Sequence, residues 1–240
     1  MNGFSFCTPS KTDFIPFTEG PDSFKTLLQE LVAFYPKHTF AATQVVYYSQ
    51  PSTFVPTPLF DAKLLPSYLR FYGEIEKSHH LDYEELEEQA QIQVYALPTR
   101  IDAHLKEIIV PVYTCHYNSI LYRNISSFSK ELDGGTQLYI HLQSKGLDLY
   151  LVEKSTVLFQ NHFKIQNEDE FLYYVFFVVE QYKLQAEDFQ IYFLGEIPSF
   201  KSYYQAIKQY HTPIQFKENA LTSAIDIDQH PAPFMAQSSY

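Results

Sequence analysis

The fold of this chain is decided by residues 167–199, which read NEDEFLYYVFFVVEQYKLQAEDFQIYFLGEIPS. Nearly every position from Phe171 to Tyr182 is apolar or aromatic, which predicts a helix that neighbouring elements cover on most sides. Asn167 can cap its first turn, and Glu170 stands at the capping-box position. Between Phe189 and Leu194, large apolar residues occupy both alternating faces. This pattern predicts a strand inside a sheet, ending at Gly195.

The segments on either side of this stretch predict the rest of a mixed sheet. Apolar and polar residues alternate before the helix, with turn residues between the runs, which predicts a three-stranded antiparallel meander. After Gly195 we expect a helix capped by Ser199 and a last strand. The three strands of the meander, this helix and the last strand are expected at Leu138–Leu142, Leu147–Leu151, Val157–Phe163, Phe200–Ile207 and Ile214–Phe216.

The first half of the chain has a less regular pattern. Strands are expected at Gly3–Cys7, Phe14–Phe17, Gln44–Ser49, Gln91–Leu97 and Tyr113–His116, and helices at Phe24–Tyr35, Leu59–Tyr72, Thr99–Ile109 and Asn118–Leu132. Pro66 is expected to interrupt the second helix, and Thr99 with Asp102 to form a capping box for the third. The polar segment Gly73–Gln89 separates two of these elements, and its acidic run Asp82–Glu88 is expected to be a solvated helix face.

The order of the elements in residues 136–216, β-β-β-α-β-α-β, is that of a ribonuclease H-like lobe, and the first half repeats it imperfectly. Two such lobes in tandem resemble the actin-like ATPases. At closer range, EDEFLYY at 168–174 and YFLGEI at 192–197 resemble an uncharacterised bacterial family with that fold. The resemblance implies an α/β fold with mixed sheets in two tandem ribonuclease H-like lobes, and it implies no activity.

The same resemblance suggests a division of the chain. Residues 1–133 are expected to form a first actin-like lobe that lacks its opening strand, and residues 134–217 a second, complete lobe. Residues 218–240 have no consistent period and are expected to be a loose C-terminal tail.

Composition excludes several classes of function. The 240 residues include 17 Lys and Arg against 28 Asp and Glu, a formal charge of −11, and the basic residues are scattered singly. A nucleic-acid partner is therefore not expected. No run of about 18 uncharged apolar residues predicts a membrane span. The two cysteines form no disulfide framework and no signal peptide is recognised, so we expect a cytoplasmic protein.

The resemblance also indicates where ATP and magnesium would bind. Actin-like ATPases hold phosphates on glycine-rich hairpins that carry an Asp, because backbone N–H groups approach phosphate only where side chains are absent. Here the second-lobe hairpin, His141–Gly146, has one Gly and no Asp. Gly146 and Gly195 would contact a nucleotide only if one binds, and Gly195 is more simply explained as a tight strand exit. We therefore expect no cofactor, no catalytic residue and no metal site, with ATP and magnesium as the alternative.

Other residue pairs have plainer interpretations than chemistry. His79-His80 could bind a metal only with a third ligand, so a surface loop is favoured. Cys115 and His116 are neighbours on a strand and point to opposite faces, so they cannot form a nucleophile–base pair, and Cys115 is expected in the core. The pair Gly134-Gly135 could form an anion-binding nest, but a helix stop is favoured.

The leading hypothesis is a cytoplasmic, non-catalytic actin-like scaffold that binds an unidentified protein partner. Tyr203, Tyr204 and Tyr210 are the candidate contact residues, with core packing as the plainer explanation for each. The alternative is a divergent ATP-binding protein or weak ATPase, with nucleotide between the lobes near Gly195 and Gly146. Its support is analogy of fold, which does not imply function.

Overall fold

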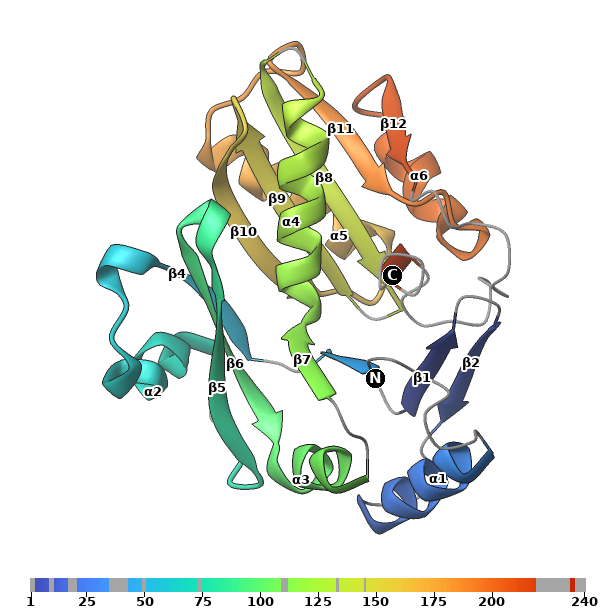
Figure 1. Cartoon of the computed structure of the whole chain (residues 1–240). Coiled ribbons are helices and arrows are strands. Elements are labelled where there is room, and N and C mark those ends of the chain that lie inside the picture. The colour runs from blue at the N-terminus through green and yellow to red at the C-terminus, as the bar shows by residue number, and fades with distance from the viewer. Residues whose placement is uncertain are drawn as a thin grey trace. The chain divides into compact units, whose positions relative to one another are not determined.

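The computed structural model describes residues 3–8, 11–16, 21–34, 43–48, 51–72, 75–108, 112–132, 134–144, 146–218 and 234–235 (Figure 1). The chain divides into two compact units. The first comprises Met1–Phe4 and Ile15–Ile120, and the second Ser5–Phe14 and Leu121–Tyr240. The expected lobe limits at residues 133 and 217 remain predictions.

The described residues form the following strands and helices. The strands are β1 (Gly3–Thr8), β2 (Lys11–Pro16), β3 (Thr43–Tyr47), β4 (Ser52–Pro56), β5 (His79–Leu86), β6 (Gln91–Pro98), β7 (Val112–His116), β8 (Thr136–Gln143), β9 (Gly146–Glu153), β10 (Thr156–Lys164), β11 (Phe189–Leu194) and β12 (Ile214–Lys217). The α-helices are α1 (Pro21–Phe34), α2 (Leu65–Leu69), α3 (Thr99–Ile108), α4 (Tyr117–Lys130), α5 (Glu168–Gln181) and α6 (Lys201–Ile207). None of the helices in the described residues is long and apolar enough to cross a membrane.

A five-stranded sheet forms the centre of the second unit, in the order β10-β9-β8-β11-β12. The first three strands pair antiparallel, whereas β8, β11 and β12 are parallel. A register shift between Val157 and Phe159 interrupts the ladder of β10, an edge strand. The predicted meander and the interior position of β11 are confirmed. Helix α4 lies over one face of the sheet, and α5 over the other (Figure 1).

The strand pattern explains how the core of this unit forms. Every second residue of β8 and β9 is aliphatic and buried. The side chains of these residues pack against α5, α6 and β11. Burying one such side chain contributes about 1.5–3 kcal/mol. The intervening residues face α4, where the rings of Tyr122 and Tyr150 meet edge to face at 6.3 Å.

Helix α5 begins as predicted but is less covered than predicted. The Asn167 side chain accepts the Glu170 N–H at 2.9 Å, which caps the first turn. Phe171, Val175 and Val178 are buried, while the opposite side of the helix is exposed. The expectation of cover on most sides is wrong, because only one stripe of the helix meets the sheet.

The first unit contains an antiparallel sheet that the sequence pattern does not predict. Strands β3 and β7 pair in parallel, and the chain between them folds into the antiparallel sheet β4-β6-β5. The acidic run Asp82–Glu88 is therefore not a helix face: it lies in β5 and the 3₁₀ turn after it. Its backbone is committed to pairing with β6, and its side chains alternate between exposed and partly buried positions.

Two other helix predictions for this unit need correction. The expected helix Leu59–Tyr72 is a series of 3₁₀ turns around the five-residue α2, and Pro66 stands in the first turn of α2, where its missing N–H is not needed. The predicted capping box of Thr99 and Asp102 does not form, because the Thr99 N–H donates to the Ser78 carbonyl oxygen at 2.9 Å. Asp102 is buried in the first turns of α3 and accepts hydrogen bonds from the Tyr47 hydroxyl at 2.8 Å and the Lys106 Nζ at 2.9 Å.

Two predicted caps differ from the observed helix starts. Helix α4 begins at Tyr117, and the Asn118 N–H donates to His116 Nδ1 at 3.3 Å, so His116 rather than Asn118 serves as the cap. A 3₁₀ turn, Pro198–Phe200, precedes α6, and no side chain caps that helix, so Ser199 has no capping role.

Candidate functional site

Three polar side chains form a row across β8, β9 and β10 on the face of the sheet that α4 covers. The strand register places Asp148 opposite His141 on one side and opposite His162 on the other. Asp148 Oδ2 lies 2.9 Å from His141 Nδ1, and its Oδ1 lies 2.8 Å from His162 Nδ1. Gln143 donates a further hydrogen bond to Oδ2 at 2.8 Å. We call His141, Asp148 and His162 the polar row.

The polar row keeps a carboxylate ionised inside the protein. Asp148 has no exposed surface. Burial alone would raise the pKa of its carboxyl, but the hydrogen bonds and charges of the two histidines outweigh burial and hold the pKa well below its ordinary value of 3.8. Burial and the nearby Asp148 charge raise the pKa of the Tyr150 hydroxyl on the same strand. The row is a charged centre paired inside the sheet.

Gly146, one of the two glycines considered for nucleotide contact, lies next to the polar row. A Cβ atom there would come within 2.7 Å of His162 Cε1 and 3.0 Å of the Phe163 carbonyl oxygen. Real Cβ atoms do not approach other atoms so closely. The His162 ring therefore occupies the space that only a glycine leaves open, which accounts for Gly146 without a ligand.

Replacing Gly146 by alanine is expected to lower the free energy of unfolding by about 1–3 kcal/mol, the range for overpacking at a close contact. The added methyl group pushes the His162 ring away from Asp148. Denaturant unfolding measures the effect. Ser144→Ala in the same turn is the control, because Ser144 is exposed and its loss should change stability by less than about 0.5 kcal/mol. If both variants were as stable as the original chain, the close contact would not constrain position 146.

Gly195, the second glycine, ends β11 in a conformation that favours glycine. Its φ is +82°, and its N–H donates to the Lys217 carbonyl oxygen at 2.9 Å. The Tyr204 hydroxyl donates to the Gly195 carbonyl at 3.2 Å and accepts the Ile197 N–H at 3.0 Å. A Cβ atom at Gly195 would lie 3.2 Å from Ile197 Cδ1 and 3.5 Å from Phe234 Cδ2. The geometry is that of a tight strand exit.

Phe234 connects the surroundings of both glycines. It is 1% exposed, and its ring centroid lies 6.0 Å from that of His141 on β8, while its edge lies beside Gly195 after β11. The chain leaves β8 toward one edge of the sheet and β11 toward the other. In open α/β sheets, ligands bind outside the carboxyl ends of two such strands. A side chain of the protein itself occupies that position here.

The expected loose tail lies mostly outside the described residues. Phe234 and Met235, the part of residues 219–240 that the structure describes, are both buried. For these two residues, the expectation of a loose tail is wrong, because both are buried. The Phe234 ring lies beside His141 on β8 and Gly195 after β11.

The three candidate tyrosines lie in different environments. Tyr204 is buried, and burial raises the pKa of its hydroxyl to about 12. Tyr203 is half-buried and meets the Phe171 ring edge to face at 5.4 Å. Tyr210 is 62% exposed. Only Tyr210 therefore presents a large surface to a partner, and the contact role of all three stays a prediction.

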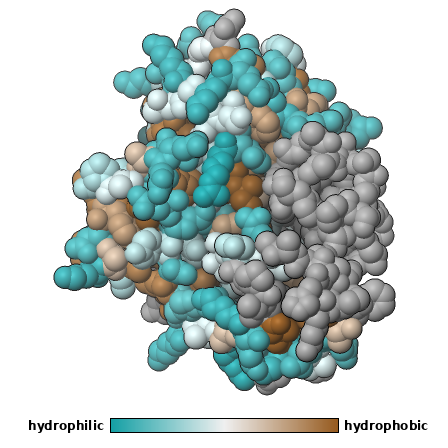
Figure 2. Space-filling view, viewed as in Figure 1, coloured by the Kyte–Doolittle hydropathy of each residue, from teal (hydrophilic) through white to brown (hydrophobic). Residues whose placement is uncertain are grey.

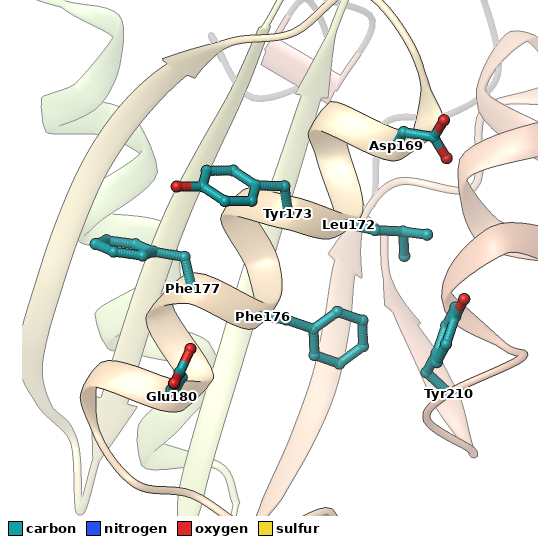
Figure 3. Close-up of a pocket in the computed structure, with 7 residues that line it drawn as sticks. All are labelled: Asp169, Leu172, Tyr173, Phe176, Phe177, Glu180 and Tyr210. Carbon is teal, nitrogen blue, oxygen red and sulfur yellow. The ribbon is translucent and has the colours of Figure 1, made fainter.

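Tyr210 lines an open groove beside α5, with a volume of about 450 Å³. In Figure 3, Leu172 and Phe176 point from the helix toward Tyr210, and Tyr173 and Phe177 project from the adjoining side. We call this feature the α5 groove; its lining residues are Asp169, Leu172, Tyr173, Phe176, Phe177, Glu180 and Tyr210. On the opposite face of the sheet, hydrophilic residues lie over α4 with hydrophobic residues between them (Figure 2).

The remaining candidates have structural explanations. His79 and His80 begin β5 rather than forming a loop, and the described residues contain no group of three His, Cys, Asp or Glu that could hold a metal ion. Cys115 is buried, as predicted, and lies 3.2 Å from Gln44 Nε2. Helix α4 ends at Lys130, and Gly134 and Gly135 adopt positive φ in the connection between α4 and β8, which favours glycine at both positions.

Comparisons with known proteins agree with this architecture. A solved protein of Bacteroides thetaiotaomicron, described as having an actin-like ATPase fold and unknown function, superposes with a TM-score of 0.76 at 16% identity, over 95% of this chain and 90% of that one. A chain of a PilM-PilN type IV pilus biogenesis complex superposes with a TM-score of 0.57 at 13% identity, over 98% and 92%. No curated protein matches the chain.

These similarities show a fold and no activity. The chain has the two tandem ribonuclease H-like lobes of the actin-like ATPases, as the resemblance implied. Residues 2–214 also match the model of one protein family, described as a protein of unknown function (DUF3822). Because that match spans most of the sequence, the chain belongs to the DUF3822 family of proteins of unknown function.

Proposed function

We propose that this protein is a non-catalytic actin-like scaffold that binds another protein. The observation that carries the proposal is the position of Phe234. The carboxyl ends of β8 and β11 are where an open α/β sheet would offer a ligand site, and Phe234 is packed there against His141 and beside Gly195. A side chain of the protein itself therefore lies where a ligand of the second unit would bind.

The chemistry of the second-lobe hairpin supports the same proposal. A phosphate needs free backbone N–H groups and a carboxylate that orients magnesium or water. The carboxylate of the polar row, Asp148, is instead shared among His141, His162 and Gln143. The His162 ring lies against Gly146, the single glycine of the hairpin. These groups hold three strands together. The Asp148 carboxylate is therefore not available to orient a nucleotide.

Two observations favour a protein partner. The PilM-PilN structure contains a chain of the same fold within a complex of proteins, so the fold can serve assembly. This protein also exposes large aromatic side chains on one side of α5, including Tyr173 at 63% and Phe177 at 41%. Exposed apolar surface of this kind is typical of interaction sites.

Thermal unfolding with and without 5 mM magnesium-ATP, a concentration of roughly a hundred dissociation constants for a 50 μM site, tests the proposal. We expect the midpoint to stay unchanged. Binding at that strength would stabilise the native state by about 2.7 kcal/mol, which at this size raises the midpoint by about 5–10 °C. Magnesium-GTP is the control for nonspecific effects. A rise of that size with ATP alone would contradict a scaffold without nucleotide and favour the alternative, a divergent ATP-binding protein or weak ATPase.

Capture from a lysate addresses the other half of the proposal. Immobilised full-length protein should retain a specific protein that an unrelated acidic protein of similar charge does not retain. Failure to retain any such protein would contradict the scaffold proposal.

A further inference from the structure

The α5 groove is apolar where a surface helix is normally polar. A helix packed on one side of a sheet needs only one apolar stripe, and Phe171, Val175 and Val178 already provide it. Tyr173 and Phe177 lie on the other side, with their rings stacked at 6.2 Å. Both side chains reach water, with Tyr173 at 63% and Phe177 at 41% exposure, so polar residues at these positions would cost the fold less than in the buried stripe. Packing against the sheet therefore explains their aromatic character only in part.

A second aromatic pair lines the groove where Tyr210 approaches α5. The rings of Phe176 on α5 and Tyr210 after α6 meet edge to face at 5.4 Å. Tyr210 comes from a different element, yet it adds its ring to the same surface (Figure 3). The groove is therefore built by two segments rather than by one helix alone, and a covering side chain would remove apolar area from water at about 25 cal/mol per Å².

The charges at the groove identify the chemistry of what it would accept. Asp169 lines one end and Glu180 the other, about 16 Å apart along the helix axis at a rise of 1.5 Å per residue. None of the seven lining residues is basic. A complementary surface thus has apolar side chains in the middle and a basic residue near each end.

A second copy of this chain and the chain's own residues 219–233 both fit this charge pattern poorly. A second copy of the chain has a formal net charge of −11 and would bring acidic groups against an acidic rim. Residues 219–233 of the chain contain two Asp and no Lys or Arg, so they offer no permanently charged basic group for either end. Charge complementarity favours a separate protein.

The backbone around the groove selects the conformation of that partner. The groove lies along a helix, whose backbone N–H and C=O groups bond within the helix, so an extended peptide finds no strand edge to pair with there. Recognition must use side chains, as when an amphipathic helix lies in an apolar groove with anchors at i, i+3 or i+4, and i+7. We propose that the α5 groove binds an amphipathic helix of a partner protein, with large apolar residues on one face and Lys or Arg near both ends. This proposal rests on the proposed scaffold function.

The test uses the full-length protein and fluorescein-labelled synthetic peptides in fluorescence anisotropy. The probe is an 18-residue helical peptide with Leu at every third or fourth position and Lys at both ends. The comparison peptides carry Glu in place of Lys, or Ser in place of Leu. We expect the Lys and Leu peptide to bind at least tenfold more tightly than either, and added salt to weaken it. Equal binding of all three peptides would overturn the proposal.

Variants locate the binding. Phe177→Ser and Tyr173→Ser should each weaken the probe about tenfold, while the exposed Phe71 serves as the matched control and Phe71→Ser should leave binding unchanged. The double variant Asp169→Lys, Glu180→Lys should exchange the preference, so that the Glu-ended peptide binds more tightly. The unfolding midpoint of each variant shows that it is folded. Undiminished binding by Phe177→Ser, or a dimer that Phe177→Ser dissociates, would contradict a partner helix in this groove.

The outcome also separates this inference from the function on which it rests. If the immobilised Phe177→Ser variant captured the same protein from lysate as the original chain, the scaffold function would stand and the α5 groove would be the wrong surface. If the original chain captured nothing and bound magnesium-ATP, the scaffold function itself would fail.

Discussion

Replacing Asp148 by asparagine is expected to destabilise the protein by about 3–5 kcal/mol, the usual cost of breaking a buried ion pair by removing one partner. The asparagine fills nearly the same volume, but it cannot accept hydrogen bonds from His141 and His162 as a carboxylate does. At this size, such a loss lowers the unfolding midpoint by roughly 6–20 °C. Thermal and denaturant unfolding measure it directly.

Glu153→Gln is the matched control for this substitution. Glu153 ends the same strand as Asp148 but is exposed, so its neutralisation should change stability by less than about 0.5 kcal/mol. If Asp148→Asn and Glu153→Gln were equally mild, the polar row would contribute nothing to stability.

The pH dependence gives a second measurement of the same group. The pKa of Asp148 is lower in the folded protein than its ordinary value of 3.8, so its contribution to stability is fully present above that value. The contribution is lost as pH falls through the folded pKa. We therefore expect the stability gap between the original chain and Asp148→Asn to shrink progressively as the pH falls below about 3.8. A gap that grew as the pH fell would contradict this assignment.

Truncating Phe234 to alanine is expected to cost about 3–5 kcal/mol, the range for a buried phenylalanine. The substitution opens a cavity beside His141 and Gly195, at the carboxyl ends of β8 and β11. Denaturant unfolding measures the loss.

Phe71→Ala controls for the loss of an aromatic ring as such. Phe71 is 80% exposed, so its removal should change stability by less than about 0.5 kcal/mol. If Phe234→Ala were equally neutral, Phe234 would not be held at the sheet, and the main support for a filled ligand position would be lost.

The elements of the second unit could be predicted because each signal there is local and agrees with its neighbours. Strict alternation in β8 and β9 identifies both strands and their buried faces, and Asn167 marks where α5 begins. Strand β5 could not be found in this way. Its side chains are mostly polar or acidic, so they show no clear apolar alternation, and pairing of its backbone with β6 holds it extended.

Only part of the candidate site could be predicted from the sequence, for a similar reason. Counting outward from the turn at Ser144 could have paired His141 with Asp148, since the hairpin register follows from the turn. His162 joins them only after the register shift in β10, whose position no periodicity reveals. The position of Phe234 could not be predicted, because nothing near it in the sequence indicates contact with β8. The exposed side of α5 was missed because hydrophobicity alone does not tell a covered face from a face awaiting a partner.

The irregular pairing of β10 limits the addition of strands from other proteins to this sheet. An unpaired sheet edge is a template on which foreign strands can add, with aggregation as the result. Here one edge of the five-stranded sheet is β10, whose ladder is broken between Val157 and Phe159, and the other is the four-residue β12, which ends in Lys217. Neither edge offers a long regular row of hydrogen-bonding groups. Addition of foreign strands to the sheet is therefore disfavoured, and specific contacts with other proteins would use the side chains of the helices.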